Sequence, residues 1–363
     1  MSNFVMLDYI HETQEAALGI LEKRAEICGE FAHDFAAGKY GRVLLTASGT
    51  SYNSCVTAKY FMEKMLRVPC ETITSYAFAH YDQTFCPDTD LVIAVTQEGE
   101  STNTIDALIK ANGLGIDNFV VTEYLNNTCT QTAKKKVTID CGREFVGPKT
   151  KGYTCTVLTL FLMALEAAKA CRYVDGTAYG DNVARLGTVL RNIDPVIEKT
   201  KTWFEAVREE FVKCEKCYVL GYGANVGTAM EGALKSMETV RYPYFWFETE
   251  EFLHGPLASV KPDVYTVLIA PRTYGYERAN ALFKIMHDQN PHVYSIGVQE
   301  GVESDHVLDG GFVDDEDFSV FEYAIPLPLL AYLTYTARGI DLQVRNYPRT
   351  REALPTKAKP LQR

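Results

Sequence analysis

The sequence predicts an α/β protein made of two similar halves, each built around a parallel β-sheet. Short segments that are apolar throughout, such as residues 42–47 and 91–96, alternate with helical patterns, as in parallel sheets covered on both faces. One constant shift, which carries Gly49 onto Gly223, aligns the first half with the second half without a gap. The length of 363 residues also exceeds the size at which one hydrophobic core keeps growing. Two copies of one fold explain these three observations.

The expected elements follow from the period of the apolar residues along the chain. A helical pattern over residues 8–37 ends at Ala37-Gly38, where the period breaks. Strands are expected at residues 42–47, 68–73, 91–96, 119–122 and 136–140, and helices after Ser51 through Met65, at residues 103–112 and at residues 155–172. The strand–turn–helix order restarts at residues 216–220, where the second half begins.

These elements predict five segments along the chain. They are an N-terminal helical segment (1–40), a first domain (41–172), a linker with helices (173–215), a second domain (216–345) and a C-terminal tail (346–363). Residues 173–181 contain glycines and separate the two repeats, so they are the best candidate for a linker. The tail is basic and contains proline, which favours a path over the surface.

The repeat itself rests on individual residues as well as on the order of the elements. The shift that pairs Gly49 with Gly223 also pairs Pro69 with Pro243, Phe78 with Phe252 and His80 with His254. It pairs Glu238 with Lys64, so Glu238 has no acidic counterpart in the first half. Any chemistry at Glu238 therefore belongs to the second half alone, and we expect the first half to bind and the second to react.

Composition excludes several classes of function. The net charge of −11 argues against a nucleic-acid partner, because neutralising phosphates requires a basic surface. The first ten residues lack the long apolar run of a signal peptide, and no apolar segment is long and uninterrupted enough to span a bilayer. The ten cysteines lie mostly in apolar segments. Together these features predict a cytoplasmic protein with reduced thiols and no membrane partner.

Two motifs that often hold cofactors are interpreted as structural. Cys214-x-x-Cys217 has no second pair of cysteines or histidines to complete a zinc site, and Cys217 opens an apolar strand. The glycines of residues 221–227 do not match the spacing of a dinucleotide loop, because the third glycine stands one position late. No cluster of histidine and carboxylate residues has metal-ligand spacing, so no metal or other cofactor is expected.

Two polar loops of the first half are candidates for ligand binding. Residues Ser48, Gly49, Thr50 and Ser51 open a helix after the first strand, and residues 96–102 open another helix after the third strand. In an open parallel sheet, ligands bind beyond the carboxyl ends of the strands, and helix N-termini there offer unpaired N–H groups to an anion. The alternative is that the serine and threonine residues only cap their helices.

Three residues of the second half are candidates for proton transfer. Lys235 and Glu238 stand three positions apart on one helix and therefore share a face. His254 lies in a loop before a Gly-Pro turn, and histidine is the side chain most readily poised for proton transfer near neutral pH. The alternatives are a solvated ion pair for Lys235 and Glu238, and a structural hydrogen-bonding role for the histidine.

Four motifs together resemble a known family. They are Ser-Gly-Thr-Ser-Tyr-Asn-Ser (48–54), Thr-Gln-Glu-Gly-Glu-Ser (96–101), Glu-Gly-Ala-Leu-Lys-Ser-Met-Glu (231–238) and Glu-Phe-Leu-His-Gly-Pro-Leu (251–257). From about residue 40 onward, the chain resembles the tandem sugar isomerase (SIS) domains of glutamine:fructose-6-phosphate amidotransferase (glucosamine-6-phosphate synthase) and of stand-alone fructosamine-type deglycases. The resemblance implies two flavodoxin-like, three-layer αβα domains.

The resemblance also implies roles for individual residues. Glu238 would move a proton between C1 and C2 of an open-chain sugar, Lys235 would support its charge, and His254 of a neighbouring subunit would assist ring opening or protonate the leaving group. A homodimer with shared active sites follows. The implied sugar or sugar-phosphate contacts are Ser48, Gly49, Thr50, Ser51, Thr96, Gln97, Glu98, Gly99, Ser101, Val146 and Lys149, with Lys357 as the nearest lysine after Pro348-Arg349.

The sequence departs from the family in ways that leave the substrate open. Glu98 stands where the family's phosphate loop commonly has serine, and a carboxylate beside a phosphate costs energy unless a cation such as Lys149 or Lys151 compensates it. The chain begins about 40 residues before its first motif, so we expect no glutaminase domain. An isomerase or a deglycase acting on an amino-sugar or fructosamine phosphate then remains. The alternative is a non-catalytic regulatory protein that binds a sugar phosphate.

Overall fold

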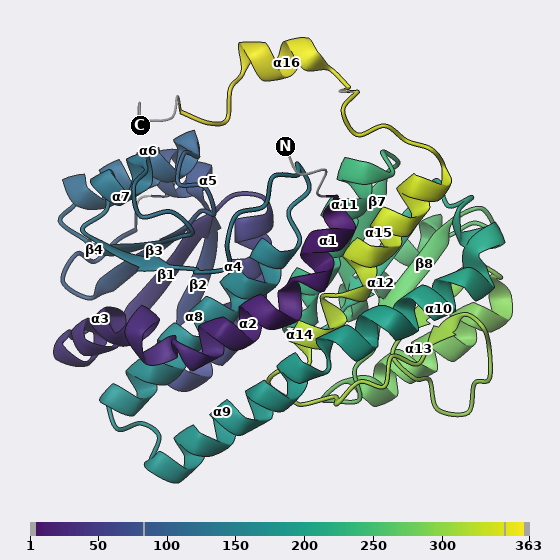
Figure 1. The fold of residues 1–363 in the computed structure, drawn as a ribbon, viewed down its shortest axis with the longest axis horizontal. Coiled ribbons are helices and arrows are strands. Elements are labelled where there is room, and N and C mark those ends of the chain that lie inside the picture. Colours follow the sequence, from purple (N-terminus) through teal and green to yellow (C-terminus); the bar gives the residue numbers. More distant parts are fainter. Residues whose placement is uncertain (1–4, 83, 345, 359–363) are drawn as a thin grey trace. The chain divides into compact units, whose positions relative to one another are not determined.

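The computed structural model describes residues 5–82, 84–344 and 346–358. The chain folds into two compact units, each with one five-stranded sheet in which every strand is parallel to its neighbours (Figure 1). The first-repeat unit comprises residues 15–144, 151–183 and the described residues from 343 onward. The second-repeat unit comprises residues 5–14, 145–150 and 184–342. The predicted α/β fold with two parallel sheets is confirmed.

The sheet of the first-repeat unit has the strand order β2-β1-β3-β4-β5. Its strands are β1 (Arg42–Ala47), β2 (Cys70–Thr74), β3 (Asp90–Val95), β4 (Asp117–Thr122) and β5 (Lys135–Thr138). Its helices are α3 (Arg24–Ala37), α4 (Thr50–Leu66), α5 (Ser75–His80), α6 (Thr102–Gly113), α7 (Thr128–Thr132), α8 (Lys151–Ala170) and α16 (Pro348–Ala353). The short helix α1 (Met6–His11) belongs to the other unit, and α2 (Thr13–Glu22) connects it to α3.

The sheet of the second-repeat unit has the order β10-β9-β8-β6-β7. Its strands are β6 (Cys217–Gly221), β7 (Tyr244–Glu248), β8 (Tyr265–Ile269), β9 (Val293–Ile296) and β10 (Val307–Leu308). The helices from residue 176 to residue 337 are α9 (Gly176–Arg191), α10 (Ile193–Phe211), α11 (Asn225–Thr239), α12 (Thr249–Leu253), the 3₁₀ helix η1 (Pro256–Ser259), α13 (Tyr276–Gln289), α14 (Val320–Tyr323) and α15 (Pro326–Ala337).

The structure confirms the internal repeat in both topology and local detail. Read from β7, the second sheet has the same strand order as the first sheet read from β2. Phe78 in α5 and Phe252 in α12, which the repeat pairs, are both fully buried against their sheets. Arg67 and Arg241, which the same shift pairs, both have a left-handed backbone conformation, with φ of 58° and 65°. Matching backbone turns and core residues therefore accompany the matching strands.

The predicted linker is wrong in its second part, because α9 begins at Gly176. The side chain of Asp175 accepts a hydrogen bond from the backbone N–H of Ala178 at 2.8 Å, and this caps the first turn of the helix. The glycines that suggest a linker are thus accommodated within a capped helix. The tail contains the short helix α16, and most of its described side chains are exposed.

Helix α8 is the central helix of the first-repeat unit. Contrary to the expectation that no segment is long and apolar enough to cross a bilayer, this helix is so among the described residues, but 89% of its apolar window is buried inside the protein. It packs against α3 and α4, and the rings of Phe61 and Phe161 stack at a centroid distance of 4.3 Å. Its composition is accordingly that of a core helix.

All ten cysteines lie in described parts of the chain and are free thiols. Cys214 and Cys217 are both buried, and the hydroxyl of Tyr244 donates a hydrogen bond to the sulfur of Cys214 at 3.2 Å. The burial of both thiols agrees with the structural interpretation of this pair of cysteines.

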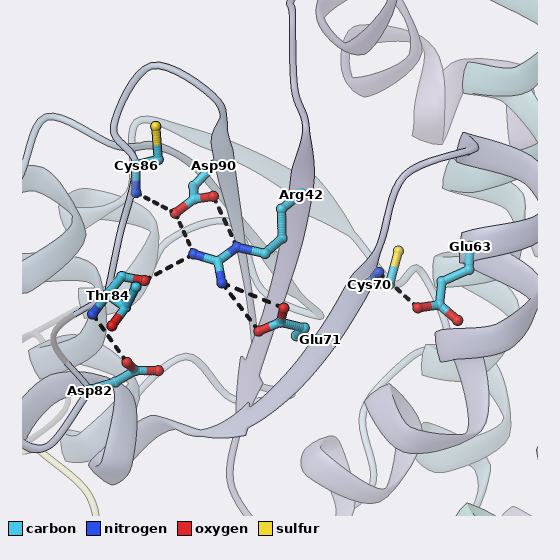
Figure 2. A network of polar contacts seen from close by, with 8 residues as sticks. All are labelled: Arg42, Glu63, Cys70, Glu71, Asp82, Thr84, Cys86 and Asp90. Carbon is cyan, nitrogen blue, oxygen red and sulfur yellow. Dashed lines mark hydrogen bonds and ion pairs between the residues drawn. The ribbon is translucent and has the colours of Figure 1, made fainter.

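A charged network holds the amino ends of the first three strands together (Figure 2). The guanidinium of Arg42 donates to Asp90 at 3.0 and 2.8 Å, to the carbonyl of Thr84 at 3.0 Å, and to Glu71 at 3.3 Å. The Asp90 side chain is 2% exposed and also accepts from the backbone N–H of Cys86 at 2.7 Å. Burial alone would raise the pKa of Asp90, but the hydrogen bonds from Arg42 and Cys86 lower it below its ordinary value.

Replacing Arg42 with methionine is expected to lower the free energy of unfolding by about 2–3 kcal/mol, because Asp90 loses its buried cation. The lowered pKa of Asp90 also sets the sign of a pH effect. Its contribution to stability is present above the unfolded pKa of about 4 and is lost as pH falls through the folded value. Urea unfolding of wild type and variant between pH 7 and pH 3 should therefore show their stabilities converging in acid. An equally stable Arg42→Met variant at pH 7 would contradict this role.

Candidate functional site

The loop after β1 opens α4 with residues that have short polar side chains or none. Gly49 is the N-cap of α4 and has a φ of +59°, a conformation that favours glycine. Ser48 and Gly49 are exposed, whereas Thr50 and Ser51 are half-buried in the first turn of the helix. The loop lies at the carboxyl end of β1, next to β3 in the sheet.

The loop after β3 turns sharply at Gly99, which has a φ of +74°. A Cβ atom at this position would lie 2.0 Å from the side-chain amide of Asn127, so only glycine fits there. Thr96 is buried, and Ser101 is the N-cap residue of α6. The hydroxyl of Ser101 makes no capping hydrogen bond, so this serine is not the simple cap that the structural alternative expects.

These two loops lie at the same edge of the first sheet. Strands β1 and β3 are neighbours at the centre of the order β2-β1-β3-β4-β5, and the chain winds outward in opposite directions from them. The loops therefore flank the topological switch point, where open α/β sheets bind ligands. The structure brings together the predicted residues of the two first-repeat loops.

The side chain of Gln97 is oriented by a residue that sequence reasoning missed. Its amide nitrogen Nε2 donates to Oε1 of Glu144 at 3.2 Å, and the backbone N–H of Gly152 donates to the same oxygen at 2.8 Å. Glu144 is buried. It lies 47 residues from Gln97, and nothing in the local pattern links the two positions.

Glu98 pairs with a lysine from the far end of the chain. Nζ of Lys357 lies 2.5 Å from Oε2 of Glu98, and both side chains are partly exposed. The cation that pairs with Glu98 is thus Lys357 of the C-terminal tail, whereas Lys149 and Lys151 were the lysines expected to compensate it. Lys151 itself is buried at the start of α8.

Val146 and Lys149 lie in the irregular segment between β5 and α8, and both are half-buried. This segment, residues 145–150, belongs to the second-repeat unit, whereas the two loops belong to the first-repeat unit. Their role in lining a sugar stays a prediction.

In the second-repeat unit, α11 carries a triad of charged side chains. Nζ of Lys235 lies 2.6 Å from Oε2 of Glu238 and 3.4 Å from Oε1 of Glu231. Lys235 and Glu231 are 1% and 2% exposed, whereas Glu238 is 39% exposed. The pair is thus not a solvated surface ion pair. Glu231 is a second missed residue, although its position four residues before Lys235 signals the contact.

Burial favours the neutral form of Lys235 and by itself would lower its pKa, but Glu231 and Glu238 outweigh that effect and raise it. Lys235 is therefore a charged ammonium at neutral pH. It holds the exposed carboxylate of Glu238 in one orientation while Glu231 balances its charge from the buried side. An oriented and accessible carboxylate is suited to accept a proton.

The packing of α11 explains why small residues surround this triad. A Cβ atom at Gly232 would lie 2.3 Å from Cδ1 of Leu327 in α15. Glycine at this position lets the two helices approach closely. The local sequence Glu-Gly-Ala-Leu-Lys thus serves packing as well as charge.

The structure does not bring His254 to Glu238 within one second-repeat unit. His254 is exposed and follows α12, beyond the carboxyl end of β7. Helix α11 starts at the same edge of the sheet, and Glu238 lies thirteen residues into it, about 20 Å along the helix axis. The chain then enters β7 at Tyr244, which pairs with the first residue of β6. The two side chains are therefore at opposite edges of the sheet.

Comparison with known families gives a match over most of the chain. The model of the SIS domain matches residues 39–168 and 210–303, which together exceed half of the chain. These two regions contain the two sheets except for the last strand of the second one.

Curated relatives and solved structures agree with this match. The isomerizing glutamine–fructose-6-phosphate aminotransferase of Thermococcus kodakarensis is 28% identical over 341 residues, which are 93% of this chain and 56% of that protein. The chain spans about half the length of the curated relatives it matches. A protein of Clostridium difficile 630, provisionally named a phosphosugar isomerase, has a TM-score of 0.90 at 25% identity, covering 98% and 99% of the two chains. A provisionally named sugar binding protein of Salmonella typhimurium LT2 has a TM-score of 0.78 at 28% identity, covering 89% and 98%.

Proposed function

The chain belongs to the SIS domain family, and on that premise we propose that it moves protons on an open-chain phosphorylated sugar. The product would be formed either by aldose–ketose isomerisation or by deglycation of a fructosamine phosphate. The observation that supports this proposal most is the triad of α11, in which buried Lys235 orients the exposed carboxylate of Glu238. A protein that only binds sugars has no need of such an arrangement.

In the isomerase reaction, the carboxylate of Glu238 takes a proton from the carbon beside the carbonyl and returns it to the neighbouring carbon. The intermediate is an enediol, and the carbonyl has moved between C1 and C2. In the deglycase reaction, Glu238 takes a proton from C1 of the Amadori compound and forms an enolamine. Protonation at C2 then gives an imine at C1, which water hydrolyses to an aldose and a free amine. The ammonium of Lys235 holds the carboxylate of Glu238 in place for each proton transfer.

The loops of the first-repeat unit are proposed to hold the sugar. Ser51, Gln97 and Ser101 offer hydroxyl and amide groups, and the first turns of α4 and α6 offer backbone N–H groups to an anionic substituent. Glu144 acts as a positioning residue because it holds the amide of Gln97. Val146 and Lys149 are proposed to complete the contacts to the sugar.

The separation of His254 from Glu238 supports a homodimer in which a second copy of the chain supplies the histidine. A groove of about 450 Å³ is lined mainly by apolar side chains, among them Ile285 and also Leu253 and Leu257, which stand on either side of His254 in the sequence. Leu257 and Ile285 are exposed, as expected of a surface that a second copy covers. His254 of that copy would assist ring opening or protonate the leaving group.

Mixing two inactive variants tests the shared site. Glu238→Gln and His254→Ala are each expected to be inactive as pure dimers. If each site combines residues of two chains, a re-equilibrated equal mixture should recover about a quarter of wild-type activity, because half the dimers are hybrids with one intact site of two. Mixing without exchange of subunits is the control. Failure of a mixture shown to contain hybrids to regain activity would contradict the shared site.

The reaction class is tested by following hexose 6-phosphates and fructosamine 6-phosphates by NMR with the wild-type protein. In deuterated water, either reaction should introduce deuterium at the carbon that Glu238 protonates. Deuterium in hexose phosphates alone indicates an isomerase, and release of the amine from fructosamine phosphates indicates a deglycase. Binding in calorimetry without turnover would favour the second candidate function, a regulator that binds a sugar phosphate. The similarity to the Salmonella sugar binding protein supports this second candidate.

A further inference from the structure

The C-terminal segment adds a short strand to the loop that precedes α6. Ser101 and Lys357 form an antiparallel β-bridge. Two backbone hydrogen bonds fix the register, one from the N–H of Thr102 to the carbonyl of Thr356 at 3.1 Å and one from the N–H of Ala358 to the carbonyl of Glu100 at 2.8 Å. The segment is thus fastened by its backbone to a loop that stands far from it in the sequence.

This register places Lys357 directly against Glu98. The ammonium and the carboxylate are 2.5 Å apart, with side-chain exposures of 61% and 40%. The pair stands beside the first turn of α6, where Thr102 already donates its N–H to the C-terminal segment. An anion that enters this loop therefore meets Lys357 already paired with the carboxylate of Glu98.

We propose that Glu98 and Lys357 together determine how well the loop after β3 binds a negatively charged substrate. Without ligand, the carboxylate of Glu98 keeps Lys357 on the loop; when an anionic sugar binds, its phosphate displaces that carboxylate as the partner of Lys357. Glu98 lowers the affinity for any anion that brings too few other contacts, such as free phosphate. This inference rests on the proposed function, because it assigns the phosphate of the sugar to the loop after β3.

Calorimetry with fructose 6-phosphate, fructose and inorganic phosphate tests the proposal on the whole protein. Glu98→Gln is expected to raise the affinity for fructose 6-phosphate and for inorganic phosphate by about fivefold. Lys357→Met is expected to lower the affinity for fructose 6-phosphate by about fivefold. These effects are modest because both partners are partly exposed. Binding of fructose should not change. In the Lys357→Met background, Glu98→Gln should raise the affinity for fructose 6-phosphate less than it does in the otherwise wild-type protein. Asp117→Asn, which breaks the exposed pair of Asp117 and Lys134 in the same unit, is the matched control.

Hydrogen exchange adds a readout that does not depend on the sugar. Glu98→Gln should speed exchange of the Ala358 N–H in the ligand-free protein, and Asp117→Asn should not. Two results would overturn the proposal and leave the proposed function intact, provided that the wild type turns over sugar phosphates. One is weaker binding of fructose 6-phosphate to Glu98→Gln, and the other is unchanged binding to both Glu98→Gln and Lys357→Met. A wild type that neither binds nor converts any sugar phosphate would instead overturn the proposed function, and the proposed role of Glu98 and Lys357 with it.

Discussion

Replacing Glu238 with glutamine is expected to lower kcat by about 10²–10⁴-fold, the usual contribution of a positioned general base. The amide keeps the size and the hydrogen-bonding shape of the carboxylate but cannot accept a proton at neutral pH. Because Glu238 is 39% exposed, the substitution should leave the fold intact. Turnover is measured by NMR on the sugar phosphate that the wild type converts, and binding of that sugar by calorimetry.

The matched control for Glu238→Gln is Glu198→Gln. Glu198 pairs with Lys201 across the same three-residue spacing on helix α10, with 2.9 Å between Nζ and Oε1, but its side chain is 66% exposed. Its loss should leave kcat unchanged. Turnover by Glu238→Gln at the wild-type rate would refute the proposed role, and retained binding with lost turnover separates catalysis from a general loss of affinity.

Replacing Lys235 with methionine is expected to lower the free energy of unfolding by about 3–5 kcal/mol, because a buried carboxylate then loses its cation. The carboxylate concerned is Glu231, which is 2% exposed. The double variant Lys235→Met with Glu231→Gln should recover much of that loss, since removing both charges of a buried pair costs far less than removing one. Urea unfolding of the three proteins at pH 7 measures these differences.

The raised pKa of Lys235 sets the pH dependence of the same effect. A group whose pKa is higher in the folded state contributes stability that is complete below its unfolded pKa, about 10.4, and is lost as pH rises through the folded value. The gap between wild type and Lys235→Met should therefore be constant from pH 7 to pH 9 and shrink above about pH 10.5. Lys201→Met, in an exposed pair, is the control and should cost under about 1 kcal/mol. A Lys235→Met variant as stable as the control would contradict the buried triad.

Much of the fold was predictable because apolar periodicity is a local property. The strand expected at residues 42–47 is β1 with the same bounds, and the helix expected to end at Ala37 does so. The prediction of a linker at residues 173–181 was wrong in its second part, because glycine permits a helix as well as a loop. The deciding contact is the cap that Asp175 provides.

The candidate site was predictable only in part, because only its contacts within one helix are local in the sequence. Lys235 and Glu238 are three residues apart on one helix, so their contact followed from the spacing. That the lysine is 1% exposed did not follow, because burial depends on how other elements pack against the helix. Glu144 beside Gln97 and Lys357 beside Glu98 are contacts across 47 and 259 residues, and no local pattern indicates them.

The sequence by itself determined two repeated parallel-sheet units, their common order of elements through the internal repeat, and a carboxylate and lysine on one face of a helix. Hydrophobic periodicity and helical spacing encode these features within a few residues. Only the tertiary structure decided that Lys235 is buried between two carboxylates and that Glu98 lies against Lys357. The physical reason is that charge pairing and burial depend on distances in space, which are fixed when segments far apart in the chain pack on the same edge of a sheet.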